Sequence, residues 1–103
     1  MSYKYPPRKY NRDEDFTDLY NHFEDVFCNA FWGFEVGPGW FEIIADFVIK
    51  LDSHLRKNPE MMREKYIIMQ VKEKFGSLRI YLHSSDFYLN SLIAETEKRA
   101  SNS

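Results

Sequence analysis

The segment from Trp32 to Leu55 constrains the fold most, because it breaks the chain between two amphipathic patterns. At its centre stands the run Gly37-Pro38-Gly39-Trp40. Glycine reaches positive φ without steric cost, whereas proline has a fixed φ and no N–H to donate. We therefore predict a rigid structural corner at Gly37, Pro38, Gly39 and Trp40, which folds one helix back on the next.

Apolar residues recur at helical spacing on both sides of this corner. The pattern before it predicts a helix over roughly 14–31, with an apolar face of Phe16, Leu19, Tyr20, Phe23, Val26, Phe27, Ala30 and Phe31. The pattern after it predicts a helix over roughly 39–56, with Trp40, Ile43, Ile44, Phe47, Leu51 and Leu55 on one face. Asn58-Pro59 should end this second helix, because a residue before proline disfavours helical ψ.

From Tyr66 the period changes to two, which predicts a β-hairpin over 66–83 with its turn at Phe75-Gly76-Ser77. The expected inner face holds Met69, Val71, Leu78 or Ile80, and Leu82. The expected outer face holds Gln70, Lys72, Lys74, Arg79, Tyr81 and His83. Two strands alone are marginal in water, so the hairpin must pack on the helices or find another strand. Ser84-Ser85-Asp86 offers an N-cap for a closing helix.

The order α-α-β-β-α predicts an α+β fold. A chain of 103 residues is the size of one domain. We expect a compact single domain over 13–103, with a two-stranded antiparallel hairpin packed on helices. Residues 1–12 lack apolar periodicity and read as an extended basic and aromatic arm.

The composition indicates the cellular compartment in which the protein is expected. The single cysteine, Cys28, excludes an internal disulfide and fits a reducing environment. No run of about 18 apolar residues occurs, and the first residues lack the apolar region of a signal peptide. We expect a soluble protein of the cytoplasm that does not bind membranes.

The residues that could carry catalysis or bind metal form no recognisable motif. His22, His54 and His83 lack a partner at metal-ligand spacing, and surface histidines are the simpler interpretation. Asp86 near His83 resembles a base with its orienting group, but no Ser or Cys nucleophile lies at a recognisable elbow. We therefore expect no catalytic residues, no metal site and no cofactor.

Two charged surfaces are candidates for binding. Lys72, Lys74, Arg79 and Tyr81 share one face of the hairpin, and cations around an aromatic suit nucleic acid; the alternative is a solvated strand face. The stretch from residue 13 to 49 holds nine acids and no Lys or Arg. On the first predicted helix, Asp15, Asp18 and Asp25 follow one face and could mimic nucleic acid, although acidic faces are usually only solvated.

The runs Gly33-Phe34-Glu35-Val36-Gly37-Pro38-Gly39-Trp40 and Gln70-Val71-Lys72-Glu73-Lys74-Phe75-Gly76-Ser77-Leu78-Arg79-Ile80-Tyr81 carry a family resemblance. Over roughly 32–101, the chain resembles a family of small proteins encoded by phages and prophage-bearing bacteria. Those proteins often have cysteine where Val36 stands, Asp where Pro38 stands, and a closing Cys-x-x-Cys-Gly. This chain lacks these cysteines, so any zinc site of the family is not expected in it. The resemblance implies a phage origin and no particular activity.

From these observations we expect a phage-encoded accessory protein that binds a host protein, in host takeover or anti-defence, without catalysis. The alternative is a nucleic-acid-binding module that uses the basic hairpin face. A third hypothesis is a structural protein associated with the virion. The free edges of the hairpin could also pair between chains, which would form a homo-oligomer.

Overall fold

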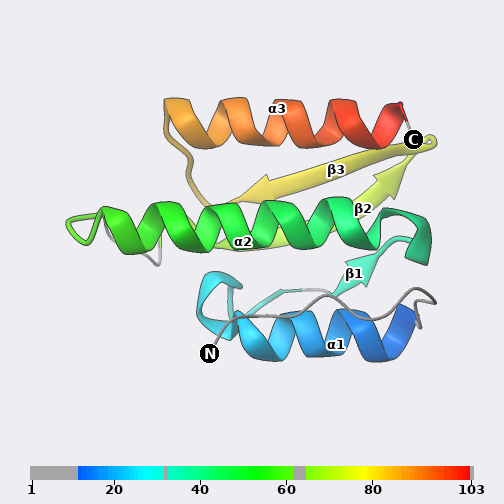
Figure 1. The fold of residues 1–103 in the computed structure, drawn as a ribbon, viewed down its shortest axis with the longest axis horizontal. Coiled ribbons are helices and arrows are strands. Elements are labelled where there is room, and N and C mark those ends of the chain that lie inside the picture. Colours follow the sequence, from blue (N-terminus) through cyan, green and yellow to red (C-terminus); the bar gives the residue numbers. More distant parts are fainter. Residues whose placement is uncertain (1–11, 32, 62–64, 103) are drawn as a thin grey trace.

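The structure, a computed structural model, describes residues 12–31, 33–61 and 65–102. These residues form helices α1 (Arg12–His22), α2 (Phe41–Lys57) and α3 (Phe87–Ser101), with strands β1 (Phe34–Glu35), β2 (Ile68–Lys74) and β3 (Ser77–Leu82) (Figure 1). Two short 3-10 turns, η1 (Glu24–Val26) and η2 (Pro38–Trp40), lie between α1 and α2. The α+β class of a compact single domain is thus confirmed; the predicted arm lies outside the described residues except for Arg12, which opens α1.

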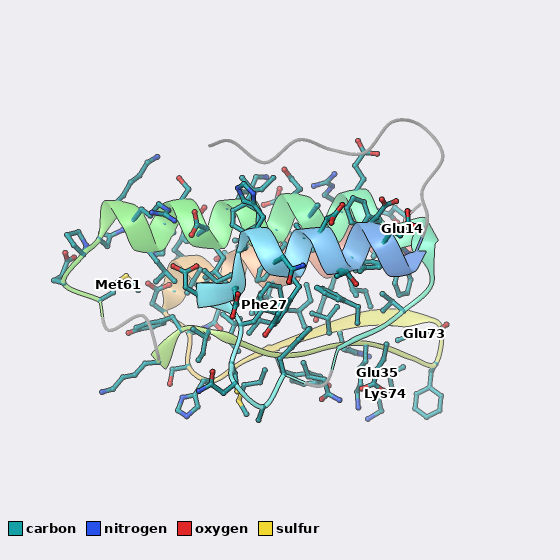
Figure 2. All side chains as sticks on the ribbon, turned by 90° about the horizontal axis from the view of Figure 1, so that it is seen from below. Glu14, Phe27, Glu35, Met61, Glu73 and Lys74 are labelled. Atoms are coloured by element: carbon teal, nitrogen blue, oxygen red, sulfur yellow. The ribbon has the colours of Figure 1, made fainter. Side chains whose placement is uncertain are left out.

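The domain has two layers. The three helices lie side by side with α2 in the middle (Figure 1), and they cover one side of the sheet (Figure 2). The core fills the space between the layers and rests on α2, whose Phe41, Phe47 and Leu51 are at most 1% exposed. Sheet residues Ile68, Val71 and Leu78 meet them from below and are equally buried. Burial of such side chains is the main favourable term in folding.

The first helix is shorter than predicted, because it ends at His22 rather than near residue 31. The chain then runs through η1 and forms a parallel bridge from Phe27 to Ile68, and the Cys28 N–H donates to the Ile68 carbonyl at 2.9 Å. Pairing with the sheet thus overrides the helical pattern beyond His22. The apolar side chains still reach the core, and Val26 and Phe27 are buried. One consequence is that Asp25 belongs to η1 and not to the face of α1.

The predicted corner has another role than the one expected. It joins β1 to α2 rather than helix to helix, and α2 begins at Phe41 with Trp40 as its N-cap residue. β1 adds a third strand, parallel to β2, with Phe34 opposite Val71. The hairpin therefore both packs on helices and gains a strand, so the prediction of a two-stranded sheet is wrong. Among the described glycines, positive φ occurs at Gly33 and Gly76, not at Gly37 or Gly39.

The antiparallel hairpin of β2 and β3 is confirmed, with one error in its inner face. Leu78, Ile80 and Val71 are buried as predicted, but Met69 is 38% exposed. The register shifts between Ile68 and Gln70, so two steps along β2 match one step along β3. This β-bulge reverses the alternation, and Ile68 takes the core position that was predicted for Met69.

Side-chain contacts attach α3 to the rest of the domain. Asp86 caps it as predicted, because its carboxylate accepts from the Leu89 N–H at 2.8 Å. At the other end, Arg99 Nη1 donates to Asp46 of α2 at 2.8 Å, and Lys50 pairs with the same carboxylate at 3.1 Å. Partial burial works to raise the pKa of Asp46, but these two cations outweigh it and lower the pKa.

The outer edge of β3 is covered by α3. The Ile80 N–H, which points away from β2, donates to the Glu97 carboxylate at 3.1 Å. A strand edge with open N–H groups can pair with another chain, and a charge placed on it opposes such pairing. Glu97 therefore disfavours a homo-oligomer built through this edge.

Replacement of Glu97 by Ala should lower the free energy of unfolding by about 1–2 kcal/mol, because the Ile80 N–H loses a charged acceptor. Glu97→Gln keeps an acceptor oxygen and should recover most of this loss. Urea denaturation measures both variants, and sedimentation tests whether Glu97→Ala self-associates. Equal stability of Glu97→Ala and the unmodified chain would show that the bond does not stabilise the fold.

Candidate functional site

The candidate site is the side of the sheet that faces away from the helices, which we call the open face. Figure 2 shows side chains such as Glu35 and Lys74 pointing to this side, opposite the helical layer. No described helix covers it. Along a strand, the residues next to a buried one point to the opposite side of the sheet. The open face therefore comprises Glu35, Gln70, Lys72, Lys74, Arg79 and Tyr81.

A row of three charges crosses the open face. Glu35 of β1 stands beside Lys72 of β2, and Lys72 stands opposite Arg79 of β3. Like charges directly opposite each other destabilise a strand pair by a few tenths of a kcal/mol to about 1 kcal/mol. The fold thus holds two cations together at some cost in stability, with one carboxylate at the end of the row.

The adjacent row holds the polar and aromatic groups. Gln70 stands opposite Tyr81, and its Nε2 lies 3.5 Å from Oε1 of Glu35. Tyr81 is 43% exposed, and the Lys72 ammonium lies 5.9 Å from the centroid of its ring. That separation allows a cation–π contact, which orders the ring and the cation relative to each other.

The structure brings together Lys72, Arg79 and Tyr81 as predicted, with Lys74 at the turn end of the same hairpin. It adds Glu35, which was not predicted from the sequence because a strand of two residues is too short to show an alternating pattern. The acidic candidates do not join this site. Asp15 and Asp18 lie on α1, in the helical layer, and Asp25 lies in η1.

Asp25 instead lines a cleft of about 680 Å³ at the C-terminal end of α1. Its lining includes Tyr20, Phe27 and Ile67 together with Glu24, Asp25 and Arg56. The Arg56 guanidinium donates to Asp52 at 2.7 Å and is also attracted by Asp25. The lining of this cleft thus combines carboxylates with a guanidinium, so the cleft does not present charge of one sign to a ligand.

Asp86 pairs with His54 of α2, rather than with His83 as the sequence suggested. The two side chains lie 3.2 Å apart, from Nε2 to Oδ2, and the imidazole stacks on Tyr88 at 4.3 Å between centroids. Partial burial works to raise the pKa of Asp86. The hydrogen bonds from the Leu89 N–H and from His54 outweigh it, so the pKa is lowered. This pair joins α2 to the start of α3.

This pairing predicts acid sensitivity. Because the pKa of Asp86 is lower in the folded chain, its stabilising effect is present above its unfolded value of about 3.9 and is lost as pH falls through the folded value. Asp86→Ala should lower the free energy of unfolding at pH 7 by about 1 kcal/mol. In denaturant titrations this difference should shrink towards pH 3. A difference that stays constant with pH would contradict the assignment.

Two further findings bear on function. Within the described residues, no three His, Cys, Asp or Glu side chains are grouped so as to hold a metal ion. None of the described helices combines the length and the apolar character needed to cross a bilayer.

Comparison of the chain with protein-family models, with curated proteins and with solved structures found no match. The phage-family resemblance stays a prediction from the sequence motifs.

Proposed function

We propose that this chain is a phage-encoded accessory protein that acts by binding a host protein in the bacterial cytoplasm, without catalysis. The observation that supports this is the open face, where the partly exposed Tyr81 lies next to the cations of Lys72 and Arg79. Tyrosine and arginine are enriched among the residues that dominate interface energies.

The charge arrangement indicates the chemistry of the partner. Lys72 and Arg79 repel each other across the strand pair, so an acidic side chain placed between them would relieve that repulsion. Tyr81 beside them offers an apolar ring with a hydroxyl that can donate or accept. The partner should therefore present an acidic side chain next to an apolar patch.

The alternative is nucleic-acid binding by the same face, which Lys72, Lys74 and Arg79 favour. Glu35 disfavours it, because its carboxylate stands beside Lys72 and would repel a phosphate backbone. A titration with single-stranded and duplex DNA and with RNA separates the two. Affinity that falls steeply with added salt, with a slope reduced by replacing the three cations with Gln, would favour nucleic acid.

The proposal is tested by affinity capture of the tagged chain from bacterial lysate, with and without nuclease. One host protein held equally in both samples, and lost with Lys72→Gln/Arg79→Gln, would support it. A control variant, Lys57→Gln/Lys98→Gln, removes two exposed cations from the helical layer and should retain the partner. Material lost on nuclease treatment would favour the alternative. An empty capture in both samples would contradict host-protein binding and favour a virion or self-associating role.

A further inference from the structure

We infer that Phe75, at the tip of the hairpin, inserts into an apolar pocket of a protein partner, with Lys74 paired to an acidic group at the rim of that pocket. The inference rests on the proposed function and deepens it, since it adds an anchor beyond the open face and a shape for the partner. It follows from the backbone conformation of Phe75, from its exposure, and from the charges beside it.

The backbone conformation of the turn disfavours phenylalanine at position 75. Lys74 pairs with Ser77, so the loop consists of Phe75 and Gly76, with φ of 54° and 80°. Positive φ at both central residues is the signature of a type I′ turn, whose first position strongly prefers Asn, Asp or Gly. A bulky side chain in this left-handed region is an outlier. Phe75 is the only described non-glycine residue with positive φ. Residues in such strained backbone conformations cluster at functional sites, where function rather than stability retains them.

The ring contributes little to the fold in return. Phe75 is 94% exposed, while Phe16, Phe41 and Phe47 are at most 2% exposed in the core. The Lys74 ammonium lies 5.9 Å from the centroid of the Phe75 ring. A large apolar side chain held outward on a tight turn can be enclosed from several sides by a pocket.

The groups beside the tip favour a protein over a phosphate-bearing partner. Glu35, Glu73 and Lys74 gather at this end of the sheet (Figure 2). Glu35 and Glu73 offset the cationic charge of Lys72 and Lys74, which weakens attraction to a nucleic-acid backbone or an anionic membrane surface. Buried aromatic anchors dominate many protein interfaces, and Phe75 with the Lys74 ammonium beside it can supply such an anchor. The tip joins β2 and β3, which carry most of the open face, so one partner can contact both.

The test uses the full chain and the partner identified by capture, both purified. Phe75→Asn restores the residue type that the turn prefers, so it should raise the melting temperature by a few degrees while it weakens binding about tenfold or more. A loss of affinity together with a gain of stability excludes misfolding as its cause. Phe87→Asn is the matched control, because Phe87 is 88% exposed at the start of α3. It should bind within about twofold of the unmodified chain.

A photo-reactive benzoylphenylalanine at position 75 should cross-link to one apolar segment of the partner, whereas the same group at position 87 should not. Unchanged affinity of Phe75→Asn would overturn the inference and leave the proposed function standing. Failure of the unmodified chain to hold any host protein would overturn both. Binding to phosphatidylglycerol vesicles, to DNA or to itself that depends on Phe75 would also overturn it, since the ring would then serve another occupant.

Discussion

Replacement of Phe34 by Ala is expected to lower the free energy of unfolding by about 3–5 kcal/mol. Phe34 stands in β1, and its ring stacks on Phe16 at 4.5 Å and meets Phe31 and Phe27 edge-on at 5.1 Å and 5.6 Å. It joins the third strand to α1 and to the segment after it. Its removal leaves a cavity where three aromatic rings meet, and β1 loses its anchor in the core.

Denaturant unfolding followed by circular dichroism measures this loss. Phe75→Ala is the matched control, because it deletes the same ring from an exposed position and should change the free energy of unfolding by at most about 0.5 kcal/mol. If Phe34→Ala cost as little as Phe75→Ala, then β1 would not be packed against the aromatic cluster, and the three-stranded sheet would be wrong.

The second large effect concerns binding. Lys72→Gln/Arg79→Gln should weaken the complex with the captured partner about 30-fold or more, because both cations lie at the centre of the proposed interface. The same change removes a cross-strand repulsion, but it also removes the contacts of Lys72 with Glu35 and Tyr81. These effects oppose each other, so the free energy of unfolding should change by at most about 1 kcal/mol. Calorimetric titration gives the affinity, and thermal unfolding gives the stability.

The control for this pair is Lys57→Gln/Lys98→Gln, which makes the same change in net charge on α2 and α3. It should bind within about threefold of the unmodified chain, since long-range charge effects are screened over about 8–10 Å. Equal losses in the two double variants would mean that net charge, not the open face, determines affinity.

Local signals in the sequence were enough to predict the parts of the fold that depend on neighbouring residues. The helical period of α2, the alternation along β3 and the cap at Asp86 all appear where they were expected. The outer-face residues Lys72, Arg79 and Tyr81 were placed correctly for the same reason. After the bulge, successive side chains of a strand point to opposite faces of the sheet, so the sequence alone shows which residues share this face.

Non-local pairing could not be predicted in this way. β1 is only two residues long, and it exists because Phe34 and Glu35 pair with residues of β2 far along the chain. The same cause ended α1 early, since Phe27 bridges to Ile68. These pairings placed Glu35 on the open face and moved Asp25 from the helix into η1. The bulge at Met69 likewise depends on how β2 meets β3, and not on local propensity.

Binding of a host protein by the open face of the sheet is tested most directly by an NMR titration. A chain of 103 residues gives a resolved amide spectrum, to which the captured partner is added in steps. We predict that the largest changes in chemical shift fall on Glu35 and across β2, the turn and β3, with little change along α1. The largest changes on α1 around Asp15 and Asp18 would contradict it and place the interface on the acidic helix instead.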